Sequence, residues 1–279
     1  MKPYEWMVTY TPQTEWIKGS GIIVWLSFFT GIFGSGAYLA SLYFNNLIGM
    51  MLSWLIIVVL KGGLHIGHTK RPLRIWRMVL NVRTSWIARG TVFIGLVVLF
   101  GAIQIFLSFR MPGTNAEFVF KVLTGVAAFA IMIYEGFTIN YISGIPFWNS
   151  SILPATLISW GLLGGLALLS AIAPNGAVMD AVAAVSRIVL IVTIVLTTLY
   201  LWNALYAGET SKESMKEMVR GVPFWVGAVF IGFILPIIIM FNGSALGVSS
   251  AMAFLACEII GGLAFTYSVF KVGVYRPLI

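Results

Sequence analysis

Two histidines, His65 and His68, are the only imidazoles in the chain, and they lie three residues apart. A membrane b-type haem usually takes its axial ligands from facing helices, which two histidines at one helix end do not supply, so we expect no haem. His65 can instead hydrogen-bond a quinone carbonyl oxygen and exchange a proton with it. It can equally be a helix-end histidine that binds backbone or water, and the spacing leaves both interpretations open.

Four other ionisable residues interrupt apolar runs of the sequence, namely Lys61, Glu135, Arg187 and Glu258. A charge inside a bilayer is costly, so such residues are functional candidates by default. We predict that Glu135, Arg187 and Glu258, at staggered depths, form a proton route. The alternative is that Arg187 pairs with one of the two acids and only holds the helices together. Lys61 is expected to extend its amine to the membrane surface.

A basic segment, HTKRPLRIWRMVLNVRTSW, follows the first histidine. A short helix is expected after Pro72, with two of the arginines on one face. We interpret the segment as a docking surface for an acidic partner protein, and a topology signal or a patch for anionic lipid is the alternative. The predicted docking residues are Lys70, Arg71, Arg74, Arg77 and Arg83.

The catalytic signatures of soluble enzymes are missing from the sequence, which has no nucleophile elbow, phosphate-binding loop or metal-ligand cluster. The single cysteine, Cys257, excludes an intrachain disulfide and any iron–sulfur cluster held by this chain alone. The formal net charge of +8 comes from loops between apolar runs, so we expect no nucleic-acid partner.

The elements that position these side chains are expected to be transmembrane helices. Of the 279 residues, 59% are hydrophobic and 9% are charged, which a soluble domain could not bury. The mean hydropathy is +0.97. Since a helix needs about 20 apolar residues to cross a bilayer, we predict an all-α integral membrane protein. The predicted spans are 20–44, 47–65, 87–109, 117–141, 152–173, 178–206, 223–241 and 245–272.

These spans make a single transmembrane domain over 1–279, with an N-terminal polar segment at 1–19 and a basic docking loop at 66–86. The segment GETSKESMKEMVRG is expected to be a polar loop. An even number of spans puts both termini on one side, here called face A. Of the lysines and arginines in loops, Arg110 and Lys121 fall on the opposite side, face B, and the rest fall on face A. The positive-inside rule then makes face A cytoplasmic.

Taken together, these segments resemble the NrfD/polysulfide reductase membrane-subunit family along essentially the whole chain. The first span carries GIFGSGAYLAS, similar to that family's glycine-rich first helix. HIGHTKRPLRIWR and then RTSWIARG are similar to its His-Leu-Gly, Arg-Pro and Ser-Trp loop. The most specific block is YEGFTINYISGIPFWN, in which a tyrosine precedes a Pro-x-Trp-Asn turn by twelve residues. GVPFWVG near the start of the seventh span also fits.

The resemblance implies eight helices in two four-helix bundles, in a prokaryotic plasma membrane. It implies a bound quinone, with menaquinone the expected type, and a docked iron–sulfur (ferredoxin-like) subunit. A third, catalytic subunit, often a molybdopterin enzyme, is also implied, and Arg187 matches an internal arginine of the family. The sequence departs from the pattern in having no histidine in the first span, and Arg89-Gly90 where related anchors often have Arg-Glu. The predicted quinone contacts are His65, Tyr134, Glu135, Arg89 and Asn140.

The sequence therefore predicts a membrane subunit that exchanges electrons between the quinone pool and an iron–sulfur subunit, with proton transfer as a further expectation. Such a subunit would catalyse little alone. A secondary transporter or channel is the first alternative, because glycines, prolines and internal charges also suit broken transporter helices. A purely structural membrane anchor is the second. Family precedent places the docked subunits in the periplasm, against the positive-inside rule, so the side on which face A lies stays open.

Overall fold

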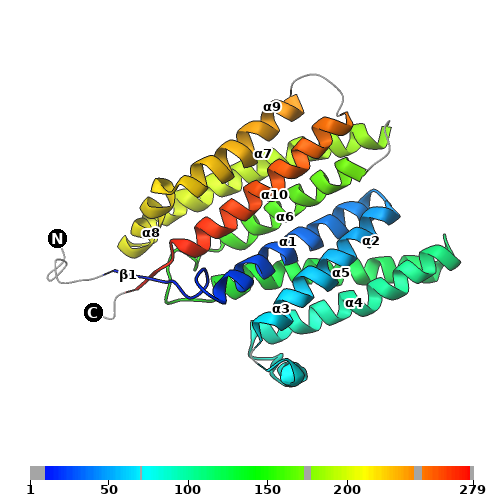
Figure 1. Ribbon diagram of the computed structural model, residues 1–279, viewed down its shortest axis with the longest axis horizontal. Helices are drawn as coiled ribbons and strands as arrows, with labels where there is room; N and C mark the ends of the chain where they lie inside the picture. Colours follow the sequence, from blue (N-terminus) through cyan, green and yellow to red (C-terminus); the bar gives the residue numbers. More distant parts are fainter. Residues whose placement is uncertain (1–9, 70, 173–176, 242–246, 277–279) are drawn as a thin grey trace.

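The computed structural model consists of long helices gathered in two bundles that lie side by side (Figure 1). It describes residues 10–69, 71–172, 177–241 and 247–276, so the predicted docking residue Lys70 lies outside the described part. Within those ranges, eight helical stretches are long and apolar enough to cross a membrane. The predicted all-α membrane fold is confirmed, with span boundaries within a few residues of the expected ones.

The first bundle contains the N-terminal half of the chain. Its spans are α1 (Gly21–Tyr43), the continuous stretch α2 (Leu47–Leu55), η2 (Ile56–Gly62) and α3 (Gly63–His68), then α4 (Trp86–Arg110) and α5 (Asn115–Asn140). The second bundle contains α6 (Ile152–Ile172), α7 (Ala177–Tyr206), the stretch η4 (Pro223–Ile234) with α9 (Leu235–Phe241), and α10 (Val248–Lys271). The N-terminal half of the chain thus forms one bundle, and the C-terminal half forms the other.

The two bundles meet where α1 packs against α6. Their backbones approach so closely that a Cβ atom added to Gly36 would lie 2.0 Å from the carbonyl oxygen of Gly161. Small residues permit this approach, and in lipid the resulting van der Waals contact is a main source of helix association. The glycine-rich first span is therefore the joint between the bundles.

Two of the spans contain π-helical stretches, η2 and η4. A π turn accommodates an extra residue and rotates the side chains that follow it around the helix axis, and such turns occur often at functional sites. In the second span this irregularity falls at Lys61, immediately before the turn that carries His65. The π turn thereby changes the direction in which the Lys61 side chain points.

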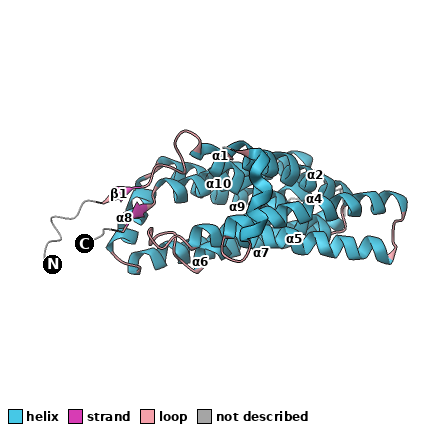
Figure 2. Ribbon diagram, turned by 90° about the horizontal axis from the view of Figure 1, so that it is seen from below, coloured by secondary structure: helices cyan, strands magenta, loops and turns pink. Residues whose placement is uncertain are grey.

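Face A carries the shorter elements, η3 (Pro72–Asn81), α8 (Glu209–Arg220), β1 (Thr11–Pro12) and β2 (Val274–Tyr275). Figure 2 shows the two strands as the small exception in a helical molecule. They pair antiparallel, with Thr11 opposite Tyr275, and join the two ends of the described chain on one side of the membrane. This agrees with the even number of spans. The short helix expected after Pro72 is confirmed as η3.

The prediction that GETSKESMKEMVRG is a loop was wrong, because this segment forms α8. Thr210, Ser214 and Met218 recur every four residues and are buried on one side of the helix. Glu209 in the first turn and Arg220 in the last turn suit the helix dipole. The four-residue periodicity was present in the sequence. It did not indicate an amphipathic helix, because the buried positions are mostly small polar residues rather than apolar ones.

At face B, Glu117 closes the turn between α4 and α5. One carboxylate oxygen accepts a hydrogen bond from Ser108 Oγ at 2.6 Å and pairs with Lys121 Nζ at 2.7 Å, and the other accepts from the Gly113 backbone N–H at 2.6 Å. Gln104 Nε2 donates to Ser108 Oγ at 2.8 Å. This network holds the far end of the first bundle while leaving its face-A end open for a site.

The close contact at Gly36 gives a stability prediction. Gly36→Ala should destabilise the protein by about 1–3 kcal/mol, because the new methyl group overlaps the backbone of α6. Gly95→Ala is the matched control, since nothing lies within 4 Å of the added Cβ and alanine favours the helix. Reversible unfolding in mixed micelles measures both variants, and equal stability of the two would contradict the close packing of α1 on α6.

Candidate functional site

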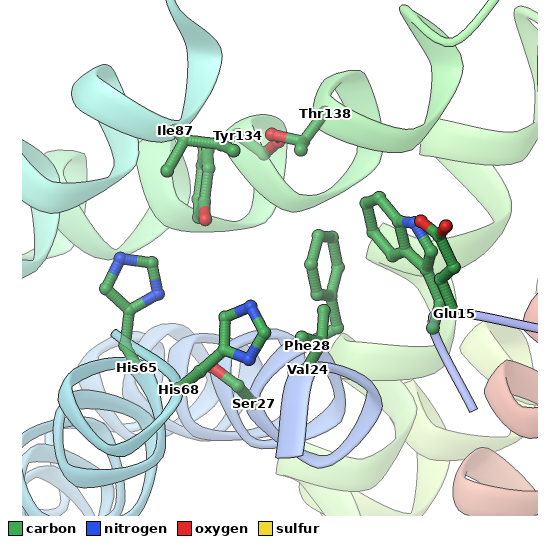
Figure 3. Close-up of a pocket in the computed structure, with 10 residues that line it drawn as sticks. Glu15, Val24, Ser27, Phe28, His65, His68, Ile87, Tyr134 and Thr138 are labelled. Atoms are coloured by element: carbon green, nitrogen blue, oxygen red, sulfur yellow. The ribbon is translucent and has the colours of Figure 1, made fainter. Parts of the chain in front are cut away.

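A cavity of about 260 Å³ lies at the face-A end of the first bundle (Figure 3). Side chains from α1, α3, α4 and α5 form its walls, and the segment before α1 covers one side. Apolar groups make up most of the lining, with a few polar groups among them. The lining residues are Glu15, Trp16, Val24, Ser27, Phe28, His65, His68, Ile87, Tyr134 and Thr138.

Tyr134 of α5 forms one wall, and its hydroxyl points into the space opposite the two histidines (Figure 3). Its ring packs directly on Gly90 of α4, where an added Cβ atom would lie 2.3 Å from Tyr134 Cζ. Any larger residue at position 90 would displace the tyrosine. The Arg89-Gly90 sequence, which departs from the Arg-Glu of related anchors, therefore has a steric reason in this chain.

Behind the tyrosine, Lys61 and Glu135 form an ion pair that is fully buried. Lys61 Nζ also donates a hydrogen bond to Ser27 Oγ at 3.1 Å. The expectation that Lys61 reaches the membrane surface was wrong. The π-helical stretch η2 places its side chain in the bundle, and Gly31 leaves room for the pair, since a Cβ there would lie 2.3 Å from Glu135 Oε1.

The ion pair is in contact with the cavity wall through aromatic rings. Lys61 Nζ lies 5.3 Å from the ring centroid of Phe28 and 5.4 Å from that of Tyr134. Cation–π attraction strengthens when the cation is desolvated, so the ammonium helps to hold both rings in place. Glu135 Oε2 has no hydrogen-bond partner among the residues that the structure describes. The site thus contains a buried cation and a carboxylate oxygen free to accept a hydrogen bond.

The two histidines lie on the opposite wall, at the end of α3. His65 is half-buried, and its Nε2 is 3.5 Å from Thr91 Oγ1, a distance at which a hydrogen bond is weak. His68 is exposed at the cavity mouth. Figure 3 shows both imidazoles facing Tyr134. His65 is thus free to bind a ligand. His68 also lines the cavity, although it was not among the predicted contacts.

The segment that precedes α1 closes the cavity on the side of the second bundle. Trp16 stacks on Phe270 of α10 with ring centroids 5.5 Å apart and meets the edge of Trp148 at 5.5 Å. Gln13 anchors the segment, because its backbone N–H donates to the Gly273 carbonyl at 2.7 Å and its side chain donates to the Phe270 carbonyl. These contacts could not be predicted from the sequence, because they join residues far apart along the chain.

Three of the five predicted quinone contacts, Glu135, Arg89 and Asn140, do not line the cavity. Arg89 donates hydrogen bonds from Nε to the Val82 carbonyl and from Nη2 to the Arg83 carbonyl, both at 2.9 Å. Asn140 Nδ2 donates to the Ser150 carbonyl at 2.7 Å. Both side chains hold loops at the ends of α4 and α5, which is a structural role in this arrangement.

None of the three predicted proton-route residues lines the cavity, and Glu135 is the one that lies behind its wall, paired with Lys61. Arg187 Nε donates to the Met240 carbonyl at 3.0 Å and so joins α7 to α9. Glu258 is fully buried in α10, and neither carboxyl oxygen has a hydrogen-bond partner among the described residues. Across the described ranges, Arg187 forms no ion pair with either acid, so the pairing expected as an alternative is not observed.

The fold and this cavity define a multi-pass membrane protein with a mostly apolar cavity, containing a few polar groups, at one end of its spans. The family model described as "Polysulphide reductase, NrfD" matches residues 14–276. The chain therefore belongs to the NrfD family, whose members are membrane subunits of respiratory oxidoreductase complexes and work with other redox subunits. A search of curated proteins finds no significant match.

The buried ion pair gives a second prediction. Lys61→Met should destabilise the protein by about 3–5 kcal/mol, because it leaves Glu135 as an uncompensated buried charge. Adding Glu135→Gln should restore most of that loss, since the double variant buries no charge. A double-mutant cycle on the free energy of unfolding measures the coupling. If the losses in unfolding free energy of the two single variants simply add in the double variant, the two side chains are not paired.

Proposed function

We propose that this cavity binds the ring of a membrane quinone or quinol, with menaquinone the expected type. The observation that carries the proposal is the arrangement of Tyr134 and His65 on opposite walls of a mostly apolar cavity at the end of the spans. At about 260 Å³ the cavity is near the lower limit of ligand sites, which suits a fused ring system. The isoprenoid tail would extend into lipid.

The residues present fit such a ring in two respects. Val24, Phe28 and Ile87 supply apolar surface for its faces. His65 and Tyr134 place polar groups on opposite sides, where a quinone carries its two oxygens. In this proposal the Tyr134 hydroxyl donates a hydrogen bond to one oxygen, while His65 binds the other and exchanges a proton with it. Arg89 and Asn140 are left out of the contact set because they bind backbone.

The bound quinone would supply two-electron redox chemistry coupled to protons, and the chain would handle the protons. Glu135 lies beside Tyr134 in sequence and keeps one carboxylate oxygen without a partner among the described residues. In the proposal it passes protons between the cavity and the protein interior, while Lys61 holds it in place. Glu258 and Arg187 stay candidates for a continuation of this route, and neither contacts Glu135 directly.

Electrons would pass between the quinone and an iron–sulfur subunit docked on face A, which itself would contact a catalytic subunit. A quinone must lie near the partner's cluster for electron transfer, and the cavity lies at that end of the bundle. Arg71 and Arg83 are exposed there and stay proposed docking residues. The prokaryotic plasma membrane is the proposed location. Acting alone, the chain would bind quinone without turning it over.

The test is quinol titration of the assembled complex. Tyr134→Phe should weaken quinol binding about tenfold, because a lost hydrogen bond of about 1.4 kcal/mol corresponds to that factor. His65→Arg should weaken it further, since the larger side chain also fills the cavity. Tyr141→Phe is the matched control, because Tyr141 lies two turns further along and is exposed.

Unaltered quinol binding in both Tyr134→Phe and His65→Arg would reject the site. If quinol oxidation by the complex also stayed unchanged, the structural-anchor alternative would be favoured. Solute movement by the purified chain without any partner would favour the transporter alternative.

A further inference from the structure

The helix η3 has the geometry of a 3-10 helix over its ten residues. With three residues per turn, side chains three positions apart are eclipsed, so the helix surface divides into three stripes. The apolar stripe is Leu73, Trp76 and Val79; the basic stripe is Arg74, Arg77 and Leu80; the third is Pro72, Ile75, Met78 and Asn81.

The middle of the third stripe faces the protein. Ile75 and Met78 are half-buried, whereas every residue of the apolar and basic stripes is exposed. Met78 Sδ lies 3.9 Å from Thr91 Oγ1 of α4, and Thr91 is the residue that contacts His65. The 3-10 geometry therefore directs one stripe to the bundle and leaves the other two to the surroundings.

The helix lies beside the first bundle rather than on top of it. In Figure 1 it is the short helix below α3 and α4, coloured cyan and viewed almost end-on, level with the end of α3 and the start of α4. In Figure 2, seen from below, it runs across the long helices. Its axis thus runs across the spans, as expected of a helix lying in the membrane plane, level with the ends of two spans.

The apolar stripe has no cover within the described chain. Leu73 is 91% exposed and Trp76 is 60% exposed. Beside it, Arg74 and Arg77 form no ion pair with any described acidic residue, and the Arg77 guanidinium lies 5.5 Å from the Trp76 ring centroid. Adjacent apolar and cationic stripes on a helix in the membrane plane are the features of an interfacial helix that binds anionic lipid.

We propose that η3 is an in-plane membrane anchor of this subunit. The stripe of Leu73, Trp76 and Val79 inserts among lipid tails, and Arg74 and Arg77 bind the phosphates of anionic phospholipids. This reassigns two of the predicted docking arginines from a partner protein to lipid, because they project beside the bundle. Through Met78 and Thr91, the bound lipid sits next to the cavity wall that carries His65. The proposal does not depend on which ligand the cavity binds.

The first experiment measures depth by spin labelling. In a Cys257→Ala background, a label at Leu73→Cys is measured in lipid nanodiscs, both in the assembled complex and after the partner subunit is removed, and a label at Glu217→Cys on the exposed side of α8 in the partner-free sample is the aqueous control. The label at 73 should be accessible to oxygen and protected from a water-soluble nickel chelate, unlike the control. Nickel accessibility at 73 equal to the control would overturn the proposal. Protection that arises only when the partner subunit binds would show protein docking instead.

The second experiment measures lipid selectivity. The double variant Arg74→Gln/Arg77→Gln should bind phosphatidylglycerol more weakly by about fivefold per arginine, because each basic residue near an anionic surface contributes about 1 kcal/mol. Arg220→Gln, an exposed arginine on the same face, is the matched control and should bind as the wild type does. Phosphatidylcholine should show no such difference. Phosphatidylglycerol binding that is equal in the double variant and the control would reject the assignment.

Discussion

The buried pair of Lys61 and Glu135 is the interaction on which the rest of the site depends. Removing two charges from water costs several kcal/mol per ion, so each side chain is tolerated only where the other meets it with additional polar contacts. That requirement fixes η2 against α5 and brings Ser27 of α1 to the ammonium. The rings of Phe28 and Tyr134 then pack around the cation, and these rings are walls of the cavity.

The spans could be predicted from the sequence because the bilayer imposes a length and an apolar composition on every helix that crosses it. The orientation of individual side chains could not. Lys61 is close to a helix end, so the simplest expectation was that its amine reaches the membrane surface. Instead, a π turn directs the side chain into the bundle, where it pairs with Glu135, a residue far away in the sequence. The helix α8 was missed for a related reason, since its buried positions are mostly small polar residues.

The site itself was partly predictable. His65 and Tyr134 were identified from motifs, and the structure places both on the cavity. Trp16 belongs to no motif, and it reaches the cavity only because the chain ends are joined through Gln13 and β2. Arg89 and Asn140 are near the cavity residues in sequence, yet their side chains satisfy loop carbonyls. A residue's position within a motif does not show whether its polar group is already hydrogen-bonded to the backbone.

Under the proposed function, face A has to meet two demands. A quinone arrives sideways from the lipid, whereas a soluble partner approaches along the membrane normal. The cavity lies where these two directions meet, with η3 beside the bundle and the paired chain ends and α8 on the face itself. Because Met78 and Thr91 connect η3 to His65, a lipid-bound η3 would fix the wall of the cavity that faces the bilayer. Under the proposed function, the basic segment therefore does more than attract a partner, since it also sets the side from which the quinone enters.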